Sequence, residues 1–171
     1  EPILIGDRNK IESNIRNNCF GACDIPIIDV NDLIEKDRLE RYANLLFKKR
    51  QRKGCNLDEA RRMIRDIYYF GVMMVESGDA DGFLAGYSTK YSDTIRPALQ
   101  ICGTNNSLKH VAGMYIIMNK KGTFFFADTT INYQPNSRTI VDTALLTANA
   151  VRKFNMEPVI SLVSYSNFGS S

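Results

Sequence analysis

PILIGDRNKIESNIRNNCFGACDIPIIDV, residues 2–30, contains two short apolar runs on either side of a polar segment. The runs, 2–5 and 25–30, have the composition of buried strands. In the segment between them, isoleucines four residues apart recur among polar residues, which predicts a short amphipathic helix over 7–18. Strand, helix and strand in this order are typical of an α/β fold with a mostly parallel sheet.

The alternation of helices and strands continues through the rest of the chain. Apolar periodicity, capping residues and glycines indicate where each element lies. They predict helices over 31–54, 60–69, 68–75, from 92 onward and 136–154, buried strands over 83–87 and 159–163, and a hairpin formed by 113–118 and 123–127. The first of these helices ends in the basic cluster 48–53, and the fourth carries Arg96 and Pro97 in its first turn.

The composition is that of an ordinary folded domain. The chain has 171 residues, 44% hydrophobic and 24% charged, with 22 Lys and Arg against 19 Asp and Glu, a net charge of +3. These values exclude disordered and collagen-like classes, and the interspersed charges predict no nucleic-acid or membrane partner. No apolar run approaches the roughly 18 to 20 residues of a membrane span. We therefore expect a cytoplasmic protein.

The four cysteines predict free thiols. Cys19 and Cys23 are the only close pair, Cys55 and Cys102 stand apart, and His110 is the single histidine. The close pair could lie on one helix face, but no further Cys or His completes a zinc site. Buried or half-buried thiols are the favoured interpretation, and no metal is expected.

Two positively charged side chains and one loop could bind an anion. Arg96, near a helix start, could join exposed backbone N–H groups in holding a phosphate or carboxylate, and Arg50 ends a basic helix. For both, a solvated surface arginine is the alternative. A loop at the predicted carboxyl end of the last strand offers Ser164, Ser166, Gly169 and Ser170 to the same kind of ligand. A loose chain end would have the same composition.

Two further polar segments have both a functional and a local interpretation. The segment 78–82, GDADG, could present two carboxylates, and Asp128 to Thr130 could form a pocket wall. Asp and Gly dominate turns for purely local reasons, so a turn is the alternative in each case. The chain also opens without Met inside a predicted strand and stops in a loop, so we expect a fragment.

Particular strings resemble the phosphate acetyl/butyryltransferase family. These are GDADGFLAG (78–86), DTIRPALQI (93–101) and Lys53-Gly54 after Arg50. Later strings, FFADTTIN (125–132), RKFNMEP (152–158) and LVSYSNFGSS (162–171), are most similar to one branch, the carboxy-terminal phosphotransacetylase-like domain of large bacterial NADP-dependent malic enzymes.

Two departures from the transferases underlie the choice of this branch. Lys90-Tyr91 stands where the transferases usually have a Ser-Thr pair, and SNFGS (166–170) stands where they have Ser-Thr-Lys-Gly-Ser. Both departures resemble the malic-enzyme branch.

The resemblance implies a two-lobed α/β/α sandwich of the isocitrate/isopropylmalate-dehydrogenase kind. Residues 1–104 would be part of the first lobe and 105–171 the start of the second, with the linker near 104–107. By position, Arg50 and Arg96 match the family's anion-binding arginines in the cleft that takes phosphate and acyl-CoA. The family's catalytic residues would lie beyond residue 171.

The resemblance also implies a function. The chain would be a regulatory domain that senses acetyl-CoA as effector and has no cofactor of its own. The parent enzyme would decarboxylate malate oxidatively in an amino-terminal malic-enzyme domain holding NADP and Mg²⁺ or Mn²⁺, and would assemble as a homo-oligomer. A free-standing phosphate acetyl/butyryltransferase is the alternative, and a scaffold that only assembles subunits is a third hypothesis.

Overall fold

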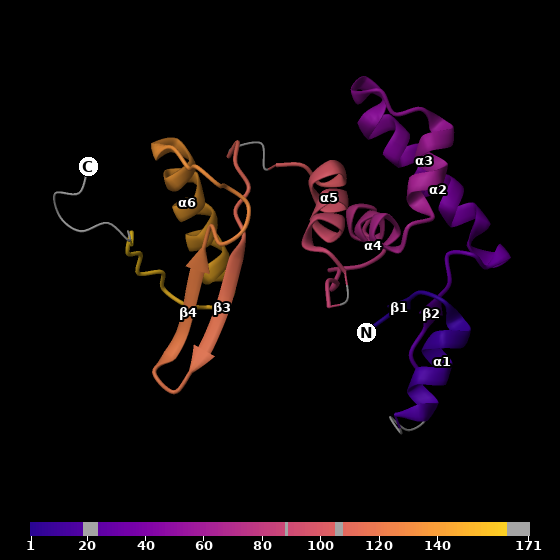
Figure 1. Ribbon diagram of the computed structural model, residues 1–171, viewed down its shortest axis with the longest axis horizontal. Coiled ribbons are helices and arrows are strands. Elements are labelled where there is room, and N and C mark those ends of the chain that lie inside the picture. The colour runs from indigo at the N-terminus through magenta and orange to yellow at the C-terminus, as the bar shows by residue number, and fades with distance from the viewer. Residues whose placement is uncertain (19–23, 88, 105–107, 164–171) are drawn as a thin grey trace. The chain divides into compact units, whose positions relative to one another are not determined.

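The computed structural model describes residues 1–18, 24–87, 89–104 and 108–163. The chain divides into two compact units, Glu1–Gly103 and Thr104–Ser171 (Figure 1). Unit 1 contains β1 (Leu4–Ile5), α1 (Arg8–Asn17), β2 (Ile27–Ile28), the 3-10 helix η1 (Leu33–Glu35), α2 (Lys36–Arg50), the 3-10 helix η2 (Gln51–Lys53), α3 (Leu57–Ile64), α4 (Ile67–Glu76) and α5 (Tyr91–Ile101). Unit 2 contains β3 (Met114–Asn119), β4 (Gly122–Ala127) and α6 (Ser137–Lys153). No helix in the described ranges combines the length and apolar character that crossing a membrane requires.

The first strand, helix and strand form as the sequence predicts. β1 and β2 pair in parallel, with Leu4 opposite Ile27. α1 connects them, and it begins where the Asp7 carboxylate accepts a hydrogen bond of 3.0 Å from the backbone N–H of Lys10. This connection confirms the mixed α/β class.

Helices α2 to α5 enclose the core of unit 1. Its largest fully buried side chains come from α2, α3 and α4. The rings of Tyr42 on α2 and Phe70 on α4 meet edge to face, with centroids 5.2 Å apart. Such contacts add to the stabilisation that burial of apolar surface provides. The large hydrophobic side chains of these three helices that are fully buried are Tyr42, Leu46, Ile64, Phe70 and Met73.

The boundary between α3 and α4 differs from the prediction. A helix over 60–69 is wrong, because α3 ends at Ile64 and α4 begins at Ile67. The Asp66 carboxylate caps the new helix by accepting hydrogen bonds from the backbone N–H groups of Tyr68 (2.9 Å) and Tyr69 (3.3 Å). Aspartate is a strong N-cap residue, and this was the signal in the sequence that the apolar periodicity obscured.

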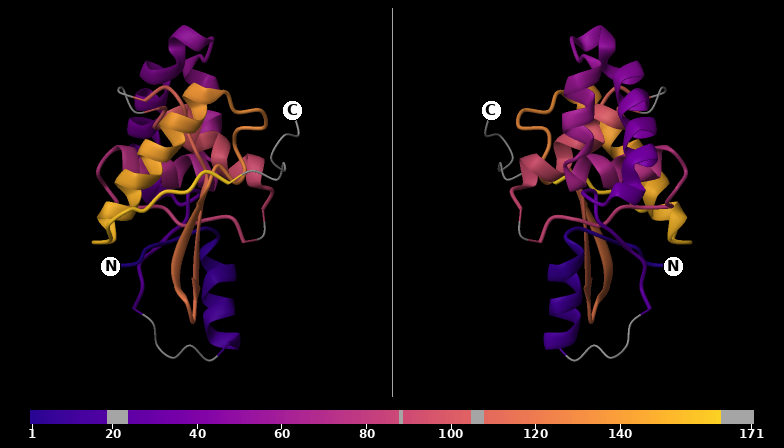
Figure 2. Two further views of the ribbon diagram at one scale, coloured as in Figure 1. Left: turned by 90° about the vertical axis from the view of Figure 1, so that its left-hand side faces the viewer. Right: turned by 90° about the vertical axis from the view of Figure 1, so that its right-hand side faces the viewer.

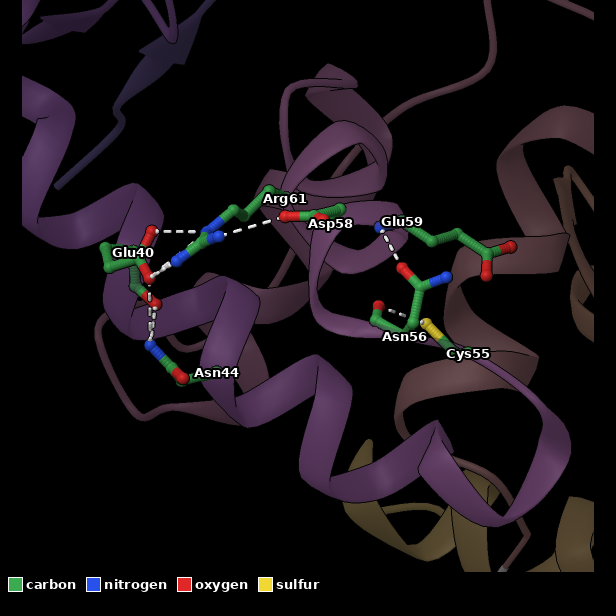
Figure 3. Close-up of polar contacts among 7 residues, drawn as sticks. All are labelled: Glu40, Asn44, Cys55, Asn56, Asp58, Glu59 and Arg61. Atoms are coloured by element: carbon green, nitrogen blue, oxygen red, sulfur yellow. Dashed lines mark hydrogen bonds and ion pairs between the residues drawn. The ribbon is translucent and has the colours of Figure 1, made fainter.

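Asn56 and Glu59 have the spacing of a capping box, and α3 begins with half of it. The Asn56 side-chain oxygen accepts a hydrogen bond of 2.8 Å from the backbone N–H of Glu59, while the Glu59 carboxylate points away from the cap (Figure 3). The helix is also joined to α2, because the Arg61 guanidinium forms an ion pair of 2.7 Å with Glu40 (Figure 3). Both side chains of that pair are about half exposed, so the cap is the stronger contribution.

Replacing Asn56 with alanine is expected to destabilise unit 1 by about 1 kcal/mol, because the N–H of Glu59 loses its acceptor. The measurement is urea unfolding. Asn9→Ala, at an exposed position inside α1, is the matched control and should not destabilise the protein, since alanine is the better helix former. An Asn56→Ala effect no larger than the control's would show that the cap contributes nothing.

Two predicted strands do not form. The segment 83–87 runs without strand pairing, with Leu84 97% and Tyr87 fully exposed, and 159–163 is likewise unpaired. Phe83 is held by packing instead, because its ring lies against Gly71 of α4, where an added Cβ would collide with it. Within the described residues these apolar runs have no strand beside them, so the predicted mostly parallel sheet is limited to the β1–β2 pair.

Unit 2 is a hairpin packed against one helix. β3 and β4 pair antiparallel, with Met114 opposite Ala127 and Asn119 opposite Gly122, which confirms the predicted hairpin. α6 packs against β4, and the turn of the hairpin extends past the end of the helix (Figures 1 and 2).

α6 forms where predicted, but its buried face differs from the predicted apolar face. Asn136 caps it by accepting a hydrogen bond of 2.9 Å from the backbone N–H of Thr139. The sequence predicts one apolar side made of Ile140, Val141, Ala144, Leu145, Ala148, Val151 and Phe154. Of these, Ala148 and Val151 are buried, whereas Ile140, Val141, Leu145 and Phe154 are exposed. The polar residues Thr139, Asp142 and Thr143 are buried as well.

Candidate functional site

Arg50 lies at the carboxyl end of α2. The helix ends with Lys48, Lys49 and Arg50 in its last turn, and η2 follows until Gly54 terminates it in a left-handed conformation, φ 89°. The backbone N–H of Cys55 returns to the Arg50 carbonyl, at 3.4 Å. Arg50 is thereby fixed at a defined point of unit 1, and its side chain is half-buried.

Arg96 lies in the second turn of α5, not in the first as predicted. The helix begins at Tyr91, with Lys90 as its N-cap residue. The backbone N–H groups without helical partners belong to the first turn, so they are not beside Arg96. Pro97 is a buried residue inside the helix, where it removes one helical hydrogen bond. The exposed Arg96 side chain must therefore bind an anion without the help of the helix start.

Tyr69 of α4 contacts α5, the helix that carries Arg96. Its hydroxyl donates a hydrogen bond of 2.8 Å to the side-chain oxygen of Gln100, which lies one helical turn after Arg96. Burial raises the pKa of the Tyr69 phenol, and the positive charges of Arg96 and Arg50 oppose that rise. The positive charges of Arg50 and Arg96 therefore both lower the pKa of the Tyr69 phenol, although the two arginines are 46 positions apart in the sequence. Neither Tyr69 nor Gln100 is identified by the sequence alone.

Neither arginine is neutralised by an acidic side chain in the described part of the chain. Ion pairs there engage several other arginines, including Arg41 with Asp79 and Arg61 with Glu40, but not Arg50 or Arg96. A guanidinium presents a planar set of donors that matches carboxylate and phosphate oxygens. Arg50 and Arg96 each keep this set of donors free of a described acidic partner, so both are chemically suited to bind an anion.

The other predicted ligand-binding residues, Ser164, Ser166, Gly169 and Ser170, lie outside the described residues, as do Cys19 and Cys23. Of the cysteines that the structure describes, Cys55 is buried, Cys102 is exposed, and both are free. The described residues contain no cluster of three or more His, Cys, Asp or Glu side chains that could hold a metal ion.

The polar segments 78–82 and 128–130, each of which could be a binding site or a turn by sequence, form turns or bends in the structure. Asp79 accepts hydrogen bonds from Arg41 and from the Tyr42 hydroxyl, so its carboxylate is committed to unit 1. Asp128 adopts a left-handed conformation, φ 57°, and its carboxylate accepts a hydrogen bond of 2.8 Å from the Asn132 side chain. These contacts favour the local interpretation of both segments.

A charged cluster in unit 2 is not apparent from the sequence. His110, which stands alone in the sequence, lies with Nδ1 2.7 Å from the carboxylate of the fully buried Asp142. Arg138, one turn earlier on α6, approaches the other Asp142 oxygen at 3.3 Å. The hydrogen bond with His110 lowers the pKa of Asp142, and the charge of Arg138 acts in the same direction. A buried carboxylate with such partners stays ionised.

We expect the Asp142 carboxylate to make the stability of unit 2 depend on pH. Its pKa is lower in the folded than in the unfolded chain, so its contribution is complete above the usual aspartate value of about 3.9 and is lost as the pH falls through the folded value. Urea unfolding followed between about pH 2 and pH 5 measures this dependence, because the loss occurs below the usual aspartate pKa. Asp142→Asn should flatten the profile at its acid end, whereas an unchanged slope would contradict the assignment.

The described chain is a mixed α/β protein in which Arg50 and Arg96 form no ion pair with a described acidic residue. It belongs to the Phosphate acetyl/butaryl transferase family, whose model matches residues 1–171.

Curated relatives and solved structures agree with this family. The chain is 33% identical to a phosphate acetyltransferase of Acetivibrio thermocellus, over 99% of this chain and 52% of that protein. It is 31% identical to the phosphate acetyltransferase of Bacillus subtilis, over 99% of this chain and 51% of that protein. The solved structure of a phosphotransacetylase from Streptococcus pyogenes superimposes with a TM-score of 0.81 at 32% identity. The match covers 100% of this chain and 51% of that protein. The chain thus spans about half the length of the curated relatives it matches.

The predicted malic-enzyme regulatory domain is wrong. These relatives are phosphate acetyltransferases, and they match the chain over almost its whole length. One of the two departures that suggested the malic-enzyme branch lies at the start of α5, where Lys90 is the N-cap residue and forms no side-chain cap hydrogen bond. The other, 166–170, lies outside the described residues. The expected oxidoreductase activity, NADP and divalent metal belonged to that parent enzyme, and the comparisons do not support them.

Proposed function

We propose that the protein containing this chain is a phosphate acyltransferase that moves an acetyl group between CoA and phosphate. The observation that supports the proposal most directly is the pair Arg50 and Arg96, neither neutralised within the described residues, in a chain of this family. The acyl-CoA is a substrate in this proposal rather than an effector.

The chemistry needs positive charge beside the phosphate group. The thiolate of CoA attacks the carbonyl carbon of acetyl phosphate, a carbon–sulfur bond forms, and the carbon–oxygen bond to phosphate breaks. The electron pair of that bond leaves with the phosphate, whose negative charge grows in the transition state. Guanidinium groups already fixed beside those oxygens stabilise the transition state more than the ground state.

The proposal includes the finer expectations that the resemblance supplies. Residues 1–104 and 105–171 are taken as parts of two lobes of an isocitrate/isopropylmalate-dehydrogenase-like fold. Ser164, Ser166, Gly169 and Ser170 are taken as further donors to the phosphate group. A homo-oligomer in the cytoplasm completes the proposal, and light scattering on the full-length protein tests its oligomeric state.

The experiment is an assay of the full-length protein with acetyl phosphate and CoA. Acetyl-CoA and inorganic phosphate should appear in equal amounts, since each transfer releases one of each. Omitting CoA serves as the control, because simple hydrolysis of acetyl phosphate would release phosphate without thioester. Phosphate release that does not depend on CoA, or no turnover at all, would overturn the proposal.

A further inference from the structure

Lys49 joins the ends of three helices in unit 1. Its ammonium group lies 2.5 Å from the carboxylate of Glu76, the last residue of α4, and 3.1 Å from the backbone carbonyl of Ile101, the last residue of α5. Lys49 itself is in the last turn of α2. One side chain thus contacts α4 and α5 from a third helix, and the contact with Ile101 spans 52 residues of sequence.

These contacts are stronger candidates for a structural role than ordinary surface pairs. The last carbonyls of a helix have no helical partner, and a positive charge is stabilised at that end by the helix dipole. Ile101 is buried, 3% exposed, and the side chains of Lys49 and Glu76 are 38% and 30% exposed. The Glu76 carboxylate also raises the pKa of the neighbouring Cys102 thiol, together with burial, which is the larger cause. Removing Lys49 would leave a partly buried carboxylate without its cation.

The rest of the basic cluster differs from Lys49. Lys48 is the neighbouring residue in the same helical turn and is exposed like Lys49, but it forms no ion pair with the acidic residues that the structure describes. Within the basic cluster 48–53, Lys49 therefore forms specific contacts that its neighbour Lys48 does not form.

The helices that Lys49 joins carry the two arginines. Arg50 is the next residue along α2, and Arg96 lies on α5, five residues before the carbonyl that Lys49 contacts. Tyr69 and Gln100 form a second link, between α4 and α5, with a hydrogen bond of 2.8 Å. The last turn of α2 is therefore tied through Lys49 to the helix that carries Arg96.

We propose that Lys49 is a positioning residue that sets the separation of Arg50 and Arg96 by joining the carboxyl ends of α2, α4 and α5. The role rests on the proposed function. Catalytic groups act only when they are held close to the productive geometry, and a displacement of about 1 Å can lower a rate about 100-fold. Lys49 would contribute through the two arginines rather than through contact with the substrate.

The kinetic test compares Lys49→Met with Lys48→Met in the full-length protein. Both variants remove one positive charge from the same helical turn, so a general attraction of anions falls equally in the two. Lys49→Met is expected to lower kcat/KM for acetyl phosphate about 10- to 100-fold, mainly through kcat, with little effect on KM for CoA. Lys49→Arg, which keeps donors for both Glu76 and Ile101, should recover most of the loss. Equal effects of the two methionine variants would overturn the proposal.

Hydrogen exchange measured by mass spectrometry supplies a readout that does not depend on activity. Lys49→Met should accelerate exchange of the backbone N–H groups near the ends of α2 and α5, and Lys48→Met should not. Unchanged exchange in Lys49→Met would overturn the positioning role even if activity fell. If the unsubstituted protein makes no acetyl-CoA, the proposed function fails, whereas the hydrogen-exchange comparison still decides whether Lys49 holds the helices together.

Discussion

Replacing Arg96 with alanine is expected to lower kcat for acetyl-CoA formation about 100- to 1,000-fold, the loss usually seen when one preorganised donor to a developing negative charge is removed. The side chain is exposed on α5 and has no acidic partner within the described residues, so its removal should leave the fold intact. The measurement is steady-state thioester formation, with circular dichroism to confirm folding.

Two further variants separate phosphate binding from a general charge effect. Arg52→Ala removes an exposed arginine of η2 that forms no ion pair with a described residue, and it should change kcat less than about twofold. Arg96→Lys keeps the charge but loses the planar set of donors, so it should recover only part of the activity. An Arg96→Ala protein as active as Arg52→Ala would exclude Arg96 from the site.

Replacing Phe70 with alanine is expected to destabilise unit 1 by about 3–5 kcal/mol, because it leaves a cavity in the centre of the core. Phe70 is fully buried, and its ring packs edge to face against Tyr42 at 5.2 Å. Urea unfolding measures the loss. Phe126→Ala, on the exposed side of β4, is the matched control in unit 2 and should cost far less, since that side chain is 53% exposed. Equal losses of unfolding free energy in Phe70→Ala and Phe126→Ala would contradict the placement of Phe70 in the centre of the core.

The helices of unit 1 were largely predictable because their signals are local. The isoleucine spacing after Asp7 predicted α1, and the basic turn before Gly54 predicted where the helical segment of α2 and η2 ends. Asn56 caps α3 at Leu57, three residues before the predicted start at residue 60. Each signal depends on hydrogen bonds or charges within a few residues, which a single sequence contains.

The strands were harder to predict because pairing depends on partners far along the chain. The apolar composition of 83–87 and 159–163 is correct for strands, but composition does not specify a neighbour, and the described residues supply none. The same limit applies to α6, which packs against β4. On this helix Thr143 is buried and Leu145 is exposed, which the apolar pattern alone does not predict.

The site could be predicted only in part. Arg50 and Arg96 were candidates from the residues alone, but only the family resemblance favoured them over solvated surface arginines, because a surface arginine and a binding arginine have the same local sequence. Tyr69 looked like one more apolar residue of a buried helix, and Lys49 like one more charge in a basic cluster. Their roles depend on Gln100 and Ile101, residues 31 and 52 positions away, and no local pattern reveals such contacts.

Calorimetric titration of the full-length protein with inorganic phosphate tests the two-arginine site most directly. We expect saturable binding at a single site, weakened at least about tenfold by Arg50→Ala and by Arg96→Ala, which is the loss of one charge-assisted contact, and unchanged by Arg52→Ala. Phosphate binding that all three variants retain alike would contradict the assignment of Arg50 and Arg96 as the anion site.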